Sequence, residues 1–242
     1  MKNGLRVTIS IIICIIFILV IYWLTGCEAK KEKVFIPFEK EIIEKVEKPI
    51  KVTHKLEVKP ILQFPELPTG CEATSLTMIL RYYGYDITKE ELVDNYMLYR
   101  TAEYPVGFEG SPYSTSGSLM WPPAIVDMAN NFLENNNSDK KAYNVSGFSL
   151  DALFEYIDKE MPVAVWINES FSTYIEYDGN ICEYDGYTYR SFWGEHCIVL
   201  TGYNLEDGIV YINNPQVGEQ EIDINLFREI YEICGSCAAV IG

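Results

Sequence analysis

Histidine and positive charge are both scarce in this chain. Its 242 residues include only two histidines, His54 and His196, so any chemistry that needs an imidazole has two candidates. Lys and Arg number 19 against 35 Asp and Glu, which gives a net charge of -16. Nucleic-acid binding requires a basic surface to meet the phosphates, so we expect no nucleic-acid partner.

Motifs of several enzyme classes are also missing. The chain has no HExxH, and two histidines are too few for a typical zinc hydrolase, so we expect no metal and no cofactor. It has neither the G-x-S-x-G of serine hydrolases nor the G-x-x-x-x-G-K-[ST] of nucleotide-binding loops, so no nucleotide is expected. A repeated Glu-Tyr-Asp-Gly does not have the spacing of an EF-hand, which favours plain turns over a calcium loop.

Residues 1–27 have the features of a targeting segment. Lys2 and Arg6 precede an uncharged, Ile-rich run that is long enough to cross a bilayer as a helix, and this charge predicts export of the rest of the chain. The run ends in Leu24-Thr-Gly-Cys27, which resembles a bacterial lipoprotein signal with Cys27 as the lipidated residue. An uncleaved signal anchor is the alternative. Both predict a domain at the extracellular face of the bacterial cytoplasmic membrane, tethered by its N-terminus.

Residues 28–58 are predicted to be a charged spacer, and residues 59–242 the folded domain. The spacer alternates Lys and Glu with scattered apolar residues, a composition too charged to form a core by itself. His54 lies in this spacer, and we expect it to be solvated. The remaining length is normal for one domain with its own core.

Hydrophobic periodicity predicts an α+β fold, with N-terminal helices packed on a C-terminal antiparallel sheet. Four helices are expected, starting at Cys71, after Thr88 (a capping box with Glu91), after Trp121 and after Ser149. Residues 99–120 form a long loop of the kind that is functional or acts as a lid. Apolar runs and Asp-Gly turns predict hairpins in 174–193, strands near 162–167, 196–201, 209–212, 218–222 and 238–241, and a short helix at 226–231.

Cys71 is the candidate nucleophile. It lies in the first turn of a predicted helix, where unpaired N–H groups and the helix dipole favour the thiolate. A small, buried and unreactive cysteine is the alternative. Five of the seven cysteines lie outside the targeting segment, an odd number that leaves at least one unpaired if the others bridge. Cys234-Gly-Ser-Cys237 has redox spacing but no long helix after it, so structural burial or a local disulfide is expected.

A thiol nucleophile needs a base, a group that orients the base, and donors for the oxyanion. His196 begins a strand, and Asn214 ends the next one, so antiparallel pairing brings the two side by side. Gln63 lies eight residues before Cys71 and can donate to the oxyanion together with the Cys71 backbone N–H. Alone, His196 is compatible with a structural role and Asn-Asn-Pro with a turn. Together the order Gln, Cys, His, Asn matches the Cys-His-Asn constellation of papain-like enzymes.

The segment Leu67-Pro-Thr-Gly-Cys-Glu-Ala-Thr-Ser75, with its helix ending in Tyr82-Tyr-Gly84, resembles stand-alone relatives of the bacteriocin-processing, double-glycine leader cysteine peptidases. The same family resemblance continues, in the same order along the chain, in residues 162–166, 195–203 and 214–218. The resemblance covers residues 60–242 and implies a papain-like fold. It also implies Cys71 as nucleophile, His196 as general base and acid, and Gln63 in the oxyanion hole. The family pattern has Asp-Pro where this chain has Asn214-Pro215, and an amide would orient His196 without a negative charge.

These observations predict a membrane-tethered, extracellular cysteine peptidase. It would hydrolyse peptide bonds in a peptide or protein substrate through an acyl-enzyme on Cys71. Two alternatives use the same domain. One is a catalytically inactive papain-like domain that binds peptide or cell-wall material, and the other is an acyl transferase that uses the same thiol.

Overall fold

The computed structural model describes residues 51–242 of the chain. The predicted targeting segment with its lipidation site Cys27, and most of the predicted spacer, lie outside the described residues. Within residues 51–242, no helix has the length and hydropathy that a bilayer crossing requires.

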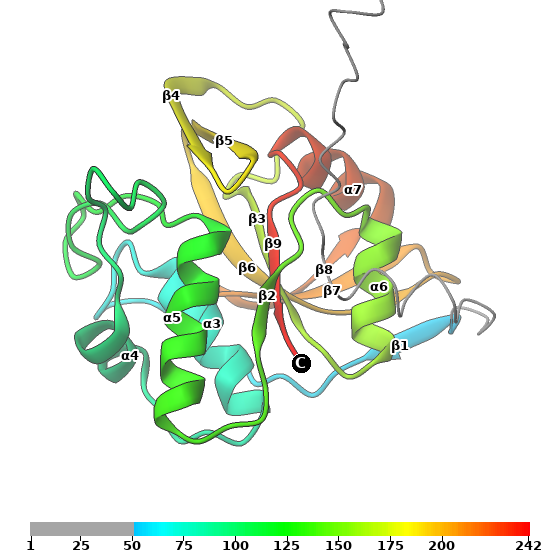
Figure 1. The fold of residues 1–242 in the computed structure, drawn as a ribbon. Coiled ribbons are helices and arrows are strands. Elements are labelled where there is room, and N and C mark those ends of the chain that lie inside the picture. Colours follow the sequence, from blue (N-terminus) through cyan, green and yellow to red (C-terminus); the bar gives the residue numbers. More distant parts are fainter. Residues whose placement is uncertain (1–50) are drawn as a thin grey trace, which may run out of the picture. The chain divides into compact units, whose positions relative to one another are not determined.

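An antiparallel sheet of seven strands forms the centre of the fold (Figure 1). Its order is β2-β9-β3-β6-β7-β8, and β1 pairs with the last residues of β6, beyond the end of β3. The strand β6 is nearly all buried, because its apolar run is covered on both faces. The strands of this sheet are β1 Thr53–Lys55, β2 Ala142–Asn144, β3 Val163–Asn168, β6 Glu195–Asn204, β7 Ile209–Asn214, β8 Gly218–Asp223 and β9 Ala238–Ile241.

Helices cover both faces of the sheet, with α3, α4 and α5 on one side and α6 and α7 on the other (Figure 1). This arrangement confirms the predicted α+β class. The predicted starts are also confirmed: Thr88 and Glu91 form a reciprocal capping box, and the Ser149 hydroxyl accepts from the Ala152 N–H. The helices are α3 Cys71–Tyr82, α4 Lys89–Tyr96, α5 Pro122–Asn135, α6 Leu150–Asp158 and α7 Ile224–Ile233.

Helix α3 is buried more completely than its periodicity predicts. The pattern indicates one apolar face, yet every residue from Cys71 to Leu80 is buried. The polar side chains on the other faces are satisfied inside the protein. Thr74 donates to the Gly70 carbonyl at 2.7 Å, and Ser75 donates to the Cys197 carbonyl of β6 at 3.0 Å. The helix that carries the candidate nucleophile is therefore a central element, held by hydrogen bonds as well as by apolar packing.

Strands β4 (Tyr177–Tyr184) and β5 (Tyr187–Phe192) form a separate hairpin between β3 and β6. Its turn is Asp185-Gly186, with φ values of 48° and 75°. The prediction of a second turn at Asp178-Gly179 is wrong. Those residues lie within β4, where the pairing register shifts between Tyr177 and Ile181. The left-handed Gly179 therefore marks a bulge in a strand rather than a chain reversal.

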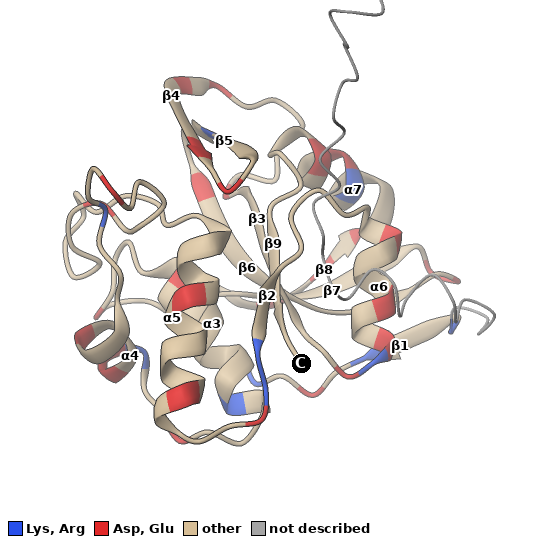
Figure 2. Cartoon of the chain, in the orientation of Figure 1, with Lys and Arg blue, Asp and Glu red and all other residues tan. Residues whose placement is uncertain are grey.

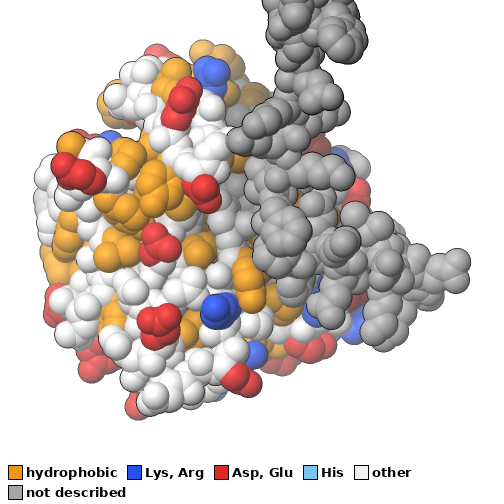
Figure 3. All heavy atoms as spheres, viewed as in Figure 1, with side chains coloured by type: hydrophobic (Ala, Val, Ile, Leu, Met, Phe, Trp, Pro, Cys, Tyr) orange, Lys and Arg blue, Asp and Glu red, His pale blue; other side chains and the backbone are white. Residues whose placement is uncertain are grey.

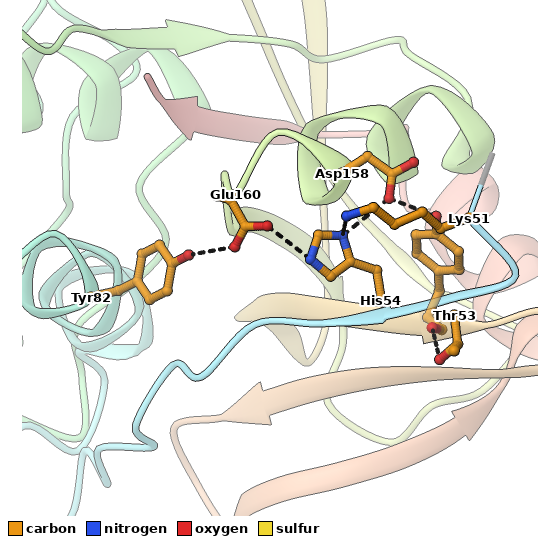
Figure 4. Close-up of polar contacts among 7 residues, drawn as sticks. Lys51, Thr53, His54, Tyr82, Asp158 and Glu160 are labelled. Atoms are coloured by element: carbon orange, nitrogen blue, oxygen red, sulfur yellow. Dashed lines mark hydrogen bonds and ion pairs between the residues drawn. The ribbon is translucent and has the colours of Figure 1, made fainter. Parts of the chain in front are cut away.

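The expectation that His54 is solvated is also wrong. His54 lies in β1, and its side chain is only 14% exposed. Its Nδ1 lies 3.1 Å from Asp158 and its Nε2 lies 3.0 Å from Glu160, at the end of α6 (Figure 4). Tyr203 of β6 donates to the same Asp158 carboxylate at 2.8 Å. These contacts exist because β1 completes the edge of the sheet next to α6, so the folded unit begins before residue 59.

The surface of the described chain reflects its acidic composition. Asp and Glu residues lie on α4, α5, α6 and the β4–β5 hairpin, and few Lys and Arg residues are seen (Figure 2). Below the hairpin, hydrophobic side chains gather among these carboxylates (Figure 3). There a cleft of about 370 Å³ lies between the start of α5 and the turn of the hairpin, lined by Pro123, Val126, Asp127, Asn144, Tyr184 and Asp185.

Candidate active site

A cleft of about 390 Å³ opens where the start of α3 meets the start of β6. It brings together three of the predicted site residues, Gln63, Cys71 and His196. One wall comes from the long loop before α5, and another from the turn that leads into β6. The loop contributes Thr115, Gly117, Ser118 and Leu119, and the turn contributes Phe192, Trp193 and Gly194.

The fourth predicted residue, Asn214, lies behind His196 at the end of β7. Its Oδ1 is 2.8 Å from His196 Nε2, and both side chains are almost fully buried. The orientation of the Asn214 amide follows from its other partners. Its Nδ2 donates to Gln220 at 2.9 Å, and its Oδ1 accepts the Gln216 N–H at 2.9 Å.

This network assigns the tautomer of His196. Because Asn214 Oδ1 accepts, His196 Nε2 must carry the hydrogen, and Nδ1 of the neutral ring is a bare acceptor. Burial lowers the pKa of His196, whereas the hydrogen bond to Asn214 and the charge of Glu169 act in the opposite direction. The resting ring is therefore neutral near pH 7, with Nδ1 available to take a proton.

Gln63 is held at the cleft by several contacts. Its backbone N–H donates to the Pro215 carbonyl at 2.7 Å, directly after Asn214, and its side-chain Nε2 donates to the Pro68 carbonyl at 2.8 Å. The buried ammonium of Lys89 binds the Gln63 carbonyl at 2.9 Å and the Glu66 carboxylate at 2.8 Å. An amide nitrogen has two hydrogens, so one can bind Pro68 while the other serves the cleft.

The surroundings of Cys71 differ from the expectation drawn from its helix position. A helix start favours the thiolate, yet burial raises the pKa of the Cys71 thiol well above its usual range, and Glu72 and Glu195 raise it further. A hydrogen bond from the backbone of Cys197 lowers it by less. The Cys71 Sγ donates to Glu72 Oε2 at 3.2 Å. These contacts favour the protonated thiol of Cys71 over the thiolate.

Two carboxyl groups near the thiol, Glu72 and Glu195, line the candidate site but were not predicted from the sequence. Glu72 is 1% exposed, and burial raises its pKa to about 7. Burial also raises the pKa of Glu195 well above its usual range, with Glu72 and Glu169 adding to the effect. Their positions offered a signal, because Glu72 follows the candidate nucleophile and Glu195 precedes the candidate base.

The loop wall of the cleft is hydrogen-bonded to the chain next to the candidate nucleophile. Thr69, two residues before Cys71, donates its hydroxyl hydrogen to the Ser114 carbonyl at 2.9 Å. A Cβ at Gly117 would collide with the Thr69 hydroxyl and lie 2.5 Å from the Ser111 carbonyl. Only glycine fits at this contact, which explains one of the glycines in the loop.

The two cysteines of the CxxC pair, Cys234 and Cys237, do not line this cleft. The five cysteines of the described chain are all free, and Cys234 and Cys237 are buried. Burial raises the pKa of both thiols, as it does for structural cysteines. Structural burial therefore describes the CxxC pair. Within residues 51–242, no three His, Cys, Asp or Glu side chains are grouped as a metal ion would require.

A buried histidine–asparagine pair in one cleft with a cysteine at a helix start is the arrangement of papain-like cysteine peptidases. The chain belongs to the Peptidase C39 like family, whose family model matches residues 55–239. The resemblance seen in the sequence is thereby confirmed.

Two relatives from Bacillus are similar over most of their length. A Bacillus anthracis protein, whose crystal structure is described as that of a C39-like peptidase, is 26% identical with a TM-score of 0.64, over 78% of this chain and 97% of that one. The uncharacterized protein YvpB of Bacillus subtilis (strain 168) is 29% identical over 192 residues, which are 73% of this chain and 70% of that protein. A double-glycine motif protease from an AMS/PCAT transporter aligns at 16% identity with a TM-score of 0.44, over 78% of this chain and 93% of that one.

Proposed function

We propose that this protein is a membrane-tethered, extracellular cysteine peptidase that cleaves peptide bonds through an acyl-enzyme on Cys71. The observation that carries the proposal is the hydrogen bond between His196 Nε2 and Asn214 Oδ1 at 2.8 Å. It leaves His196 Nδ1 as the proton acceptor of a ring that lines the same cleft as Cys71. Thiol activation requires a proton acceptor of this kind next to the nucleophile.

The proposed cycle uses only groups of this cleft. The Cys71 thiol gives its proton to His196 Nδ1, and the thiolate attacks the peptide carbonyl carbon. The oxyanion accepts hydrogen bonds from the Gln63 amide and from the Cys71 N–H, one of the N–H groups that a helix start leaves unpaired. The His196 imidazolium then protonates the leaving nitrogen as the C–N bond breaks. Water, deprotonated by His196, hydrolyses the thioester and restores the thiol.

The charges of the cleft bear on the substrate. Among the described residues that line it, the acidic side chains are Glu72, Glu169, Asp178 and Glu195, and none is Lys or Arg. A cleft of one charge sign attracts ligands of the opposite sign and repels those of the same sign. Acidic residues next to the cleaved bond should therefore be disfavoured.

The test is to incubate the purified full chain with a peptide library that contains basic, neutral and acidic residues, and to identify products by mass spectrometry. We expect cleavage by the wild type and none by Cys71→Ser or His196→Ala. Products in water enriched in ¹⁸O carry one heavy oxygen if the reaction is hydrolysis. An adduct with an added amine would instead identify an acyl transferase. Peptide binding without any cleavage would refute the peptidase proposal.

The tether is tested separately, by the mass of the mature N-terminus in membrane fractions. A diacylglyceryl-modified Cys27 supports a lipoprotein, and an intact Met1 supports an uncleaved anchor. A soluble chain lacking both would overturn the membrane part of the proposal and leave the peptidase part intact.

A further inference from the structure

Glu72 makes two hydrogen bonds that no step of the proposed cycle uses. Its Oε2 accepts from the Cys71 thiol at 3.2 Å, and its Oε1 accepts from the Met120 N–H at 2.6 Å. The carboxyl group is 1% exposed, so both contacts are shielded from water. One side chain thus joins the nucleophile to the end of the loop that walls the cleft.

We propose that, in this peptidase, Glu72 is a positioning residue that holds the Cys71 thiol protonated at rest and fixes the cleft wall at Met120. The inference rests on the proposed function for its meaning, but the resting state of the thiol can be measured without any substrate.

The first half of this role follows from the charges around the sulfur. Glu72 on α3 and Glu195 on β6 are the carboxyl groups that face Cys71, and Cys197 on β6 is the other titratable group beside it. His196 shares the cleft and is neutral at rest. A carboxylate that accepts the S–H hydrogen stabilises the thiol and opposes the thiolate, because two like charges would otherwise meet in a buried site.

The second half follows from Met120. Its N–H is held by Glu72, and its carbonyl accepts the indole N–H of Trp166 in β3 at 3.0 Å. The end of the loop is therefore clamped between α3 and the sheet, next to Leu119 in the cleft lining. Attack by Cys71 requires the thiol to leave Glu72 and pass its proton to His196. Glu72 keeps its bond to Met120 throughout, so the wall stays in place while the sulfur moves.

The experiment is the pH dependence of Cys71 alkylation by iodoacetamide in the full chain, followed by mass spectrometry of the Cys71 peptide. Glu72→Gln keeps an oxygen for Met120 and removes the charge. We expect the midpoint to move to lower pH by about one unit. Alkylation should then be about tenfold faster below both midpoints, as long as the pH stays above about 7, where Glu72 of the wild type is charged. Glu103→Gln, the same change at an exposed position of the same loop, should leave the profile unchanged.

Two further variants separate the parts of the role. Glu195→Gln changes a carboxyl group that has no hydrogen bond to the sulfur, and should move the midpoint by less. Glu72→Ala loses the Met120 anchor as well, and should speed amide hydrogen exchange at Met120, whereas Glu72→Gln should not.

An unchanged or higher midpoint in Glu72→Gln would overturn the proposal, as would a larger shift in Glu195→Gln. A measurement on the wild type covers the case in which Glu72→Gln does not fold. The infrared difference between wild type and Cys71→Ala should show an S–H stretching band at pH 7, and its absence would also overturn the proposal. If the wild type cleaves no peptide but Glu72→Gln still shows the shifted alkylation midpoint, only the peptidase function is refuted.

Discussion

Replacing Asn214 by alanine should prevent His196 from accepting a proton without changing Cys71 itself. In the wild type, the Asn214 oxygen at 2.8 Å holds the hydrogen of His196 on Nε2. Both side chains are nearly fully buried, so water does not readily replace the lost acceptor. The buried Nε2–H then either stays unpaired or moves to Nδ1, where it blocks transfer of the thiol proton.

The structure sets the size of this effect. A buried donor left without its partner costs about 1 to 3 kcal/mol. Since each 1.36 kcal/mol is a factor of ten, the population of the productive tautomer should fall by roughly 5- to 150-fold. The rate of Cys71 alkylation at pH 7 should fall within this range, and so should kcat/KM for any peptide that the wild type cleaves.

The neighbouring Asn213 provides a matched control. It is also buried, in the same strand, but its Nδ2 donates to the Val58 carbonyl at 2.7 Å and it makes no side-chain hydrogen bond with His196. Asn213→Ala should lower the free energy of unfolding while the alkylation rate of the folded protein stays near that of the wild type. Equal alkylation rates in Asn214→Ala and wild type would refute the tautomer argument. An equal loss of alkylation rate in Asn213→Ala and Asn214→Ala would refute it as well.

Three further changes test the groups around the site. Burial raises the pKa of Glu72 from 4.5 to about 7, so the folded state binds its proton more tightly and loses about 3 kcal/mol of stability as pH rises through this window. Glu72→Gln should remove that slope in urea unfolding at pH 5 and 8, and an identical slope in both proteins would contradict it. Gly117→Ala should displace the loop and cost about 1 to 3 kcal/mol, and a crystal structure with the loop unmoved would disprove this. Lys89→Met should lower the unfolding free energy by about 2 to 4 kcal/mol, because three hydrogen bonds to the Gln63 loop are lost, and an unchanged urea midpoint would count against the anchor.

The opposite pH dependence is expected from His196. Burial lowers its folded pKa, so the unfolded chain binds the proton more tightly, and stability is lost as pH falls below the ordinary value of 6.5. Glu72 therefore lowers the stability as pH rises from 4.5 to about 7, and His196 raises it over the part of that range below 6.5, so the two contributions partly cancel in the wild type. In Glu72→Gln, a urea midpoint that rises with pH up to about 6.5 and then levels off would isolate the histidine contribution.

Most of the fold was predictable because its signals are local. The capping box at Thr88, the serine cap at Ser149 and the buried run that became β6 can each be recognised within a few residues. The strand β1 was missed because three residues in a charged stretch have no periodicity of their own, and the pairing with β6 alone makes them a strand. The turn at Asp178 was misplaced for the same reason. An Asp-Gly pair predicts a left-handed glycine, but it does not tell whether the flanking residues pair with each other or with another strand.

The residues that meet in the cleft were predictable from the chain alone. A cysteine at a helix start, a histidine opening one strand and an asparagine closing the next are consequences of periodicity and antiparallel order. The protonation state of those groups, by contrast, depends on the folded surroundings. Glu72 and Glu195 stand beside Cys71 and His196 in the chain, but a carboxyl group opposes a thiolate strongly only when both are removed from water. Burial depends on atoms contributed by α3, β6 and the loop that ends at Met120, and no local pattern in the chain encodes it.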